Sequence, residues 1–294
     1  MNAAPRFVHS LSTRPMLIDC YGIDSLRRLL VQVWYFSLSV AYLKRLGAPV
    51  VLHTDALGAA VLGHLPYDEI HLTLDDWPAG LHPRFWAAGK FVALAAEQAP
   101  CIHIDGDVFV KRPEALQRMA DMMAEADLLV QSLDPACMYG LDAGLFEREA
   151  EFCRDHGIVF DGRDATNTGV LGVSSDDVRR TLCDNYFEVV RYFSEKYADE
   201  LENGTLLTPD LIAEQKMTDG LAAARGWKLR LLLDDARMAS EIGYQHVYSI
   251  DKMNHMPQCI ETLRRVSPEI YEQTLRICGG MEAWIKPAPP VSQE

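Results

Sequence analysis

The first 110 residues alternate between short apolar stretches typical of strands and longer stretches with the periodicity of helices. The expected strands are Arg6–Leu11, Pro49–His53, Glu69–Leu72 and Cys101–Ile104, and the expected helices are Ser25–Leu46, Leu57–Gly63 and Phe85–Gln98. Strands and helices that alternate at this spacing form βαβ units, in which the strands are parallel. The sequence therefore predicts an α/β fold with a mixed, mostly parallel central sheet flanked by helices.

The rest of the chain is less regular but contains the same kinds of element. Strands are expected at 126–132, 169–173 and 228–233, and helices at about 113–125, 175–197, 209–225 and 258–266. No Pro/Gly/Ser-rich linker or internal repeat divides these segments, so we expect a single domain over residues 1–285. Residues 286–294 read as a C-terminal tail.

The charge of the chain limits the ligands that it can bind over a wide surface. Asp and Glu number 42 against 28 Lys and Arg, which gives a net charge of −14. Nucleic-acid binding depends on clustered Lys and Arg, so the balance argues against a nucleic-acid partner. A phosphate ligand is still possible if positive charge is supplied locally, for example by a metal ion.

The cysteines and the apolar segments predict a cytoplasmic protein. The seven cysteines are scattered singly, with no CxxC pair and no tight Cys/His cluster, so they indicate neither a zinc site nor a disulfide framework and fit reduced, buried thiols. The N-terminal residues lack the apolar core of a signal peptide. The most apolar run, Leu29–Leu43, is shorter than the about 20 residues that cross a bilayer, and we interpret it as a buried helix, with no transmembrane segment.

Two carboxylates follow the last of the N-terminal strands. Asp105-Gly106-Asp107 comes directly after Cys101–Ile104. Ligands of open α/β sheets bind at the carboxyl ends of the strands, and two acids separated by one glycine can reach the same divalent cation. Two solvated loop acids are the alternative. The haloacid-dehalogenase-like phosphatases have a related DxDx[TV] pattern, but Phe109 occupies the last position of that pattern here.

A second candidate motif lies near the end of the domain. His246 is followed six residues later by Lys252, in the run His-Val-Tyr-Ser-Ile-Asp-Lys. A neutral imidazole nitrogen is a suitable third ligand for an ion such as Mn²⁺, and the lysine can reach a phosphate oxygen beside it. An ordinary core or surface histidine is the alternative interpretation of His246.

Four segments together resemble glycosyltransferase family 8 and its relatives. Phe85–Pro113 is similar to a segment of the family that contains a basic residue, a helix, an apolar strand and a DxD motif, in that order. Asn167-Thr168-Gly169 is similar to the family's N-[SA]-G strand. Glu214-Gln215 resembles the acidic-Gln pair of the family. His246–Lys252 has the His-x-x-Gly-x-x-Lys spacing, with Ser249 where glycine is usual.

The resemblance implies a Rossmann-like A-type glycosyltransferase domain. Residues 1–110 would be the nucleotide-binding half and 111–285 the acceptor half. The donor would be a nucleoside-diphosphate sugar, most simply a UDP-sugar, and the acceptor a saccharide, protein or small molecule. Mn²⁺ (or Mg²⁺) would be held by Asp105, Asp107 and His246, where it would stabilise charge on the departing diphosphate.

The resemblance also assigns roles to residues around that metal. Lys90, Asn167 and Lys252 would contact the donor, as would Asp105 through the cation. Gln215 or Glu214 would lie under the reacting sugar, in a reaction that retains the anomeric configuration.

Other roles near the site stay open. Ser10 would lie near the base and ribose, while Asp55 either approaches the nucleotide or caps the next helix. An inverting enzyme would need a carboxylate base instead, for which Asp210 or Asp219 is available. A nucleotidyltransferase and a non-catalytic nucleotide-sugar or metal-binding relative are the competing hypotheses, and Ser249 is the best support for the latter.

Overall fold

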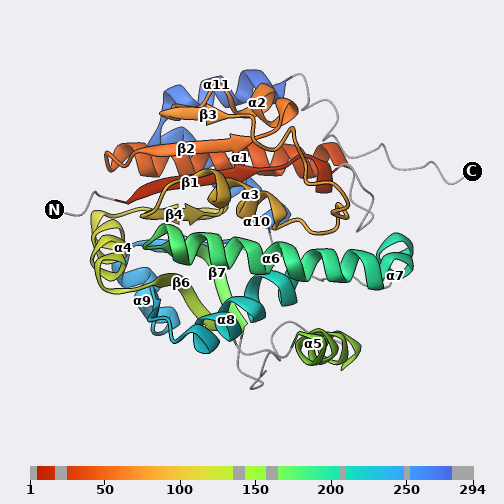
Figure 1. Cartoon of the computed structure of the whole chain (residues 1–294). Coiled ribbons are helices and arrows are strands. Elements are labelled where there is room, and N and C mark those ends of the chain that lie inside the picture. Colours follow the sequence, from red (N-terminus) through yellow and green to blue (C-terminus); the bar gives the residue numbers. More distant parts are fainter. Residues whose placement is uncertain are drawn as a thin grey trace, which may run out of the picture.

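The central sheet of the protein is mixed, as a computed structural model shows. The model describes residues 5–16, 25–134, 143–156, 165–204, 210–247 and 252–279. Within these residues the sheet has seven strands, which from one edge to the other are β3 (Glu69–His71), β2 (Val50–Thr54), β1 (Arg6–Leu11), β4 (Cys101–Ile104), β7 (Ala165–Val173), β6 (Leu128–Asp134) and β8 (Leu229–Leu231) (Figure 1).

Most neighbouring strands of the sheet are parallel. The first four strands, β3 to β4, pair in parallel, with Phe7 opposite Val50 and Ile102 in register. Of the described strands of this sheet, β7 alone runs against its neighbours, pairing antiparallel with both β4 and β6, while β6 and β8 are parallel. The predicted fold class, α/β with a mixed, mostly parallel sheet flanked by helices, is confirmed.

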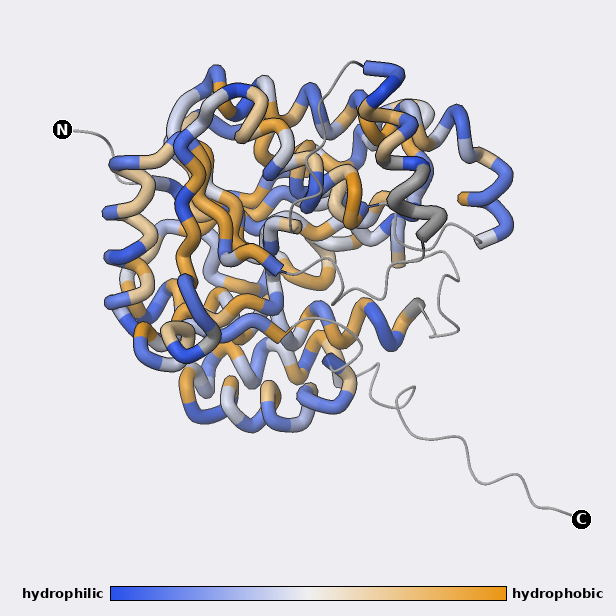
Figure 2. Tube along the Cα trace, turned by 90° about the horizontal axis from the view of Figure 1, so that it is seen from below, coloured by the Kyte–Doolittle hydropathy of each residue, from blue (hydrophilic) through white to orange (hydrophobic). Residues whose placement is uncertain are grey.

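Helices cover both faces of the sheet (Figure 1). One face carries α1 (Ser25–Arg45), α10 (Lys252–Val266) and α11 (Pro268–Gly279), whose apolar side chains pack with Phe7 and Ile102 of the strands. The other face carries α3 (Ala88–Ala96) and α6 (Asp176–Lys196), which pack with Val8 and Leu171. Figure 2 shows the apolar residues gathered along the inner strands, with hydrophilic residues on the outward helical faces.

The other described helices are shorter or lie at the rim. They are α2 (Ala56–Leu62), α4 (Pro113–Glu125), α5 (Ala143–Asp155), α7 (Ala198–Asn203), α8 (Met217–Arg225) and α9 (Ala236–Ile242), together with a 3₁₀ turn at Arg14–Met16 and a π-helix at Leu211–Lys216.

Helix α1 explains the most apolar run of the sequence. Its side chains pack on the sheet on one side and on α10 and α11 on the other, so Trp34 and Tyr35 are at most 1 % exposed. A helix that is apolar around most of its circumference is expected to be buried in this way. The interpretation of Leu29–Leu43 as a buried helix is confirmed, and none of the described helices is long and apolar enough to span a membrane.

Several elements differ from the sequence-based expectation. The helix expected from Phe85 begins at Ala88, β7 begins at Ala165 rather than Gly169, and the expected helix over 209–225 opens with the π-helix. A small antiparallel sheet of β5 (Val108–Val110) and β9 (Tyr244–His246) was not expected. β5 directly follows the DxD turn and β9 follows α9 after a single glycine, so neither is set off by flanking turn residues that would mark it as a strand in the sequence. Ser249 and the tail 286–294 lie outside the described residues.

Truncating the buried face of α1 should destabilise the fold. We expect Trp34→Ala to lower the free energy of unfolding by about 3–5 kcal/mol, because it removes a fully buried indole and leaves a cavity. The matched control is Trp86→Ala, whose side chain is 46 % exposed and whose loss should change stability by less than about 0.5 kcal/mol. Urea denaturation measures both, and equal losses would contradict the assignment of α1 to the core.

Candidate functional site

Asp105 and Asp107 flank a tight turn between β4 and β5. The turn is closed by the Val108 N–H, which donates to the Asp105 carbonyl at 3.0 Å, while the Asp105 N–H donates to the Gly169 carbonyl at 2.9 Å. Gly106 lies against the ring of Phe36, where a Cβ atom would come within 2.1 Å of a ring carbon. Glycine is therefore required between the two acids, and the turn holds both carboxylates at the carboxyl end of β4.

The small second sheet brings His246 to the same place. Val108 pairs with His246 in the β5–β9 register, and the Val247 N–H donates to the Asp107 carbonyl at 3.0 Å. His246 Nε2 lies 3.5 Å from Asp107 Oδ1. One ligand atom each of Asp105, Asp107 and His246 lie within 4.8 Å of one another. The three residues that the sequence predicted as metal ligands thus lie together.

Gln131 of β6, which was not predicted as part of the site, fixes the orientation of His246. Its Oε1 lies 2.8 Å from His246 Nδ1 and accepts a hydrogen bond from the Tyr244 hydroxyl at 2.5 Å. An oxygen at this position favours the tautomer with the proton on Nδ1, which leaves the Nε2 lone pair facing Asp107. That tautomer is the one that can bind a metal ion beside the two carboxylates.

Lys252, the first residue of α10, is the cation nearest to Asp107. Its Nζ lies 2.6 Å from Asp107 Oδ2, and its carbonyl accepts a hydrogen bond from the Tyr35 hydroxyl at 2.9 Å. Burial alone would raise the pKa of Asp107, but the charge of Lys252 and the contact with His246 outweigh it and hold that pKa well below its usual range. Asp107 is therefore a carboxylate at neutral pH.

Lys90 of α3 lies on the opposite side of the turn and is buried. Its Nζ lies 3.0 Å from Asp105 Oδ1, donates to the Thr168 carbonyl at 2.8 Å and forms an ion pair with Glu214. Burial would lower the pKa of Lys90, but the charges of Asp105 and Glu214 outweigh it and raise the pKa above its usual value. The ammonium group is thus held between two carboxylates and stays charged.

Asp105 differs from Asp107 in its ionisation. Burial raises the pKa of Asp105 to about 6, against the opposing charge of Lys90, and the like charges of Asp107 and Glu214 add to the increase. A bound cation would remove that repulsion, because it would place positive charge directly between the carboxylates. Two carboxylates and one imidazole that face a common point are a donor set that Mn²⁺ accepts.

The π-helix carries Glu214 and Gln215, and Glu214 is joined to Asp105 through Lys90. Glu214 is fully buried, and its Oε1 accepts a hydrogen bond from the Thr168 hydroxyl at 2.6 Å. Among the residues that the structure describes, Glu214 Oε2 and Gln215 Oε1 are buried without a hydrogen-bond partner. Buried polar atoms normally have partners, so two unpaired oxygens beside a candidate metal centre fit a group supplied by a ligand.

Asn167 and Ser10 lie around the cluster and are held by side chains of the fold. Asn167 donates to Asp134 Oδ2 at 2.9 Å and accepts from the Gly169 N–H at 3.1 Å. Ser10 Oγ lies 2.8 Å from His103 Nε2, and His103 Nδ1 lies 3.5 Å from Asp105 Oδ1. His103 therefore links Ser10 to the DxD turn, a role that its place inside an apolar strand concealed.

Two further acids considered from the sequence have structural roles. Asp55 caps α2, with one oxygen accepting from the Gly58 N–H at 2.8 Å and the other from the Thr13 N–H at 2.7 Å. The capping interpretation of Asp55 is confirmed. Asp210 accepts hydrogen bonds from the Ala87 N–H at 3.2 Å and the Tyr186 hydroxyl at 2.8 Å, which anchors the start of α3.

Comparisons with known proteins give one sequence family and distant structural likenesses. A family of unknown function (DUF6734) matches residues 27–277. No curated protein matches the chain. Mouse xyloside xylosyltransferase 1 in its apo form is 12 % identical, with a TM-score of 0.40 over 87 % of this chain and 94 % of that chain. The galactosyltransferase LgtC, solved with donor and acceptor sugar analogs, is 14 % identical, with a TM-score of 0.36 over 97 % and 98 %.

The close approach of Gly169 to His246 gives a test of the candidate metal centre. A Cβ atom at Gly169 would lie 2.5 Å from His246 Cε1 and 2.7 Å from Gln131 Oε1. We expect Gly169→Ala to displace the imidazole and weaken Mn²⁺ binding by roughly 10-fold or more, as measured by calorimetry.

Gly220→Ala is the matched control for this substitution. Gly220 lies in α8, where an added Cβ meets nothing within 4 Å, so Mn²⁺ binding should be unchanged. If Gly169→Ala folds and binds Mn²⁺ as tightly as the wild type, His246 is not a ligand.

Proposed function

We propose that this chain, which belongs to the family of unknown function DUF6734, is a metal-dependent glycosyltransferase that uses a nucleoside-diphosphate sugar. The observation that carries the proposal is the convergence of Asp105, Asp107 and His246 at the carboxyl end of β4. This is the edge of an α/β sheet where ligands bind. In this proposal the domain has the A-type glycosyltransferase fold, and residues 1–110 bind the nucleotide while 111–285 receive the acceptor.

The chemistry required is stabilisation of the leaving diphosphate. A divalent ion such as Mn²⁺, held by Asp105, Asp107 and His246, supplies Lewis-acid neutralisation of that charge when bound. Lys252 adds positive charge from the chain itself, because its Nζ already lies 2.6 Å from Asp107 and is partly exposed. In this proposal the Lys252 side chain rotates from the Asp107 carboxylate to a phosphate oxygen of the donor. No proton donor is then required for the departure of the diphosphate.

The sugar would lie above Glu214 and Gln215. The unpaired Glu214 Oε2 and Gln215 Oε1 supply negative charge and an oriented dipole where positive charge develops at the anomeric carbon. Lys90 forms ion pairs with both Glu214 and Asp105. Its positive charge offsets the repulsion between these two buried carboxylates. These groups support a reaction that retains the anomeric configuration, with either residue beneath the sugar. Asp210 is already bonded to Ala87 and Tyr186, which weakens the case for it as the base of an inverting reaction.

The identity of the donor and the location of the protein are predictions that rest on the sequence alone. A UDP-sugar, an acceptor that is a saccharide, protein or small molecule, and a cytoplasmic location stay predictions. Asn167 and Ser10 are proposed to reach the donor by exchanging their present partners, Asp134 and His103, for groups of the ligand.

Release of nucleoside diphosphate tests the proposal. The full chain is incubated with a panel of UDP- and GDP-sugars, with and without Mn²⁺, and the released nucleotide is measured. We expect release with one donor only when Mn²⁺ is present. Asp107→Asn and His246→Ala should each lower the rate by roughly 10²–10³-fold, because each removes part of the electrostatic stabilisation.

Asp184→Asn is the matched control, since Asp184 is an exposed acid of α6 and should not change the rate. Pyrophosphate release in place of nucleoside diphosphate would favour a nucleotidyltransferase. Mn²⁺ and donor binding without turnover across the panel would favour a non-catalytic relative. Donor cleavage that is equal in wild type and both site variants would overturn the proposal.

A further inference from the structure

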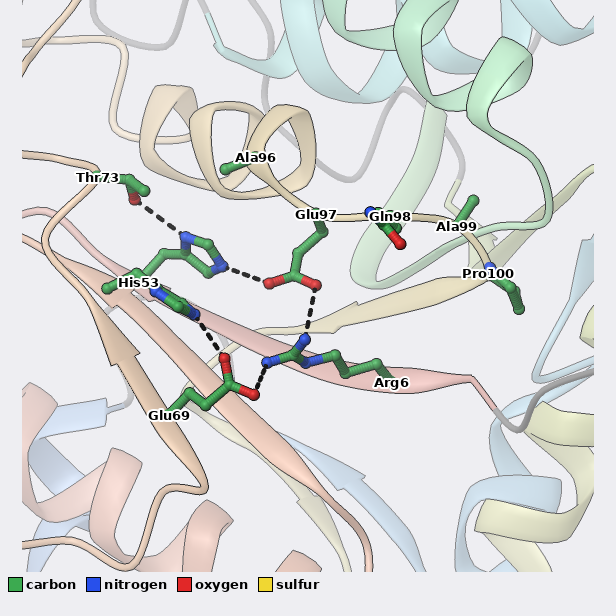
Figure 3. A pocket seen from close by; sticks show the side chains of 10 residues that line it. Arg6, His53, Glu69, Thr73, Ala96, Glu97, Gln98, Ala99 and Pro100 are labelled. Carbon is green, nitrogen blue, oxygen red and sulfur yellow. Dashed lines mark hydrogen bonds and ion pairs between the residues drawn. The ribbon is translucent and has the colours of Figure 1, made fainter.

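A second group of metal-ligating side chains lies at the β3 edge of the sheet. His53 of β2, His71 of β3 and Glu97, which follows α3, each offer one ligand atom, and these atoms lie within 4.8 Å of one another. They line a cavity of about 510 Å³ together with Arg6, Glu69 and neighbouring residues. Figure 3 shows the side chains of His53, Glu97, Glu69 and Arg6 converging on the cavity from different elements. None of these residues belongs to the candidate active site.

The inner part of this cluster, His53 and Glu97, is buried and held in place by hydrogen bonds. The side chains of His53 and Glu97 are 2 % and 6 % exposed, and His53 Nε2 lies 2.8 Å from Glu97 Oε1. On the other edge of the ring, His53 Nδ1 lies 3.0 Å from Thr73 Oγ1. Both ring nitrogens of His53 are thus engaged by side chains of the fold, which holds the imidazole in a fixed orientation toward the cavity.

The outer part of the cluster is open to solvent and carries excess negative charge. The side chains of His71 and Glu69 are 41 % and 52 % exposed, and His71 Nε2 lies 3.0 Å from Glu69 Oε2. The single guanidinium of Arg6 is shared between two carboxylates, at 2.6 Å from Glu69 and 3.7 Å from Glu97. Two carboxylates against one fixed cation favour the entry of a positive ion rather than an anion.

We propose that His53, His71 and Glu97 bind a divalent transition-metal ion of the Zn²⁺ class, with Glu69 at the open side of the site. Two imidazoles and a carboxylate suit Zn²⁺, whereas Mg²⁺ and Ca²⁺ prefer oxygen ligands alone. The ion takes the place of the proton between His53 Nε2 and Glu97. That proton moves to Nδ1 of the same ring, where Thr73 Oγ1 accepts it, so the imidazole stays neutral.

An ion at this position joins three separate segments of the chain. It links β2 and the three-residue edge strand β3 to the turn between α3 and β4. A ligand that binds only the folded state stabilises it, and the stabilisation grows with the concentration of free ion. The site is therefore expected to strengthen the edge of the sheet, without contact with the DxD turn.

Calorimetric titration of the full chain with Zn²⁺ tests this proposal independently of the proposed function. The titration is done in an Asp107→Asn background, which removes a ligand of the candidate active site. We expect one equivalent of Zn²⁺ to bind and to raise the unfolding temperature. When His71→Ala is combined with Asp107→Asn, Zn²⁺ should bind roughly 10–100-fold or more weakly than to the Asp107→Asn variant alone.

His71 and Glu69 are exposed, so His71→Ala and Glu69→Gln should leave the fold intact, as checked by circular dichroism. His255→Ala is the matched control, because His255 is an exposed histidine of α10 outside the cluster and its loss should not change the binding. Titration with Co²⁺ adds a second readout, since its visible absorption reports imidazole ligation. The proposal is overturned if Zn²⁺ does not bind, or if it binds equally well to the His71→Ala and His255→Ala variants.

Discussion

The buried ion pairs around Lys90 are the interaction on which the rest of the site depends. One ammonium group lies between Asp105 and Glu214, and it also donates to the Thr168 carbonyl. It thereby joins α3, the end of β4, β7 and the π-helix. Removing one partner from a buried charge cluster costs several kcal/mol, because the remaining charges lose their compensation. The same contacts that secure these elements therefore set the position of the DxD turn.

Antiparallel pairing connects the two parts of the sheet at this point. Strand β4 leads directly into the DxD turn, and β7, running the other way, carries Thr168 and Gly169 past that turn. The β5–β9 pair then brings His246 from a distant part of the sequence to Asp107. The convergence of Asp107 and His246 is thus produced by strand register: a one-residue shift in β9 would turn His246 to the opposite face.

The sequence predicted most strands and helices and indicated which residues to consider as metal ligands, but it did not predict the contacts that hold those residues in place. Asp105 and Asp107 were identifiable because polar residues directly after an apolar strand stand out, and His246 because of its spacing to Lys252 and its resemblance to the family motif. Gln131 and His103 were not, because each lies inside an apolar strand and meets its partner only through pairing with another strand. What marks them in the sequence is a single polar residue inside an otherwise apolar, buried strand. His53 in β2 shows the same pattern. Register and side-chain direction, which decide such contacts, are fixed by packing across the whole sheet and not by local pattern.

The net charge of −14 does not describe the local charge at the two clusters of candidate metal ligands, the one at the DxD turn and the one at the β3 edge. Near the DxD turn, the chain places Lys90 and Lys252 against the acids, so the site is not simply electronegative. At the β3 edge, Arg6 is similarly shared by Glu69 and Glu97. The donor sets differ, because two carboxylates dominate the first cluster and two imidazoles the second. The first donor set suits ions that prefer oxygen ligands, such as Mn²⁺, and the second, with two imidazoles, suits ions of the Zn²⁺ class.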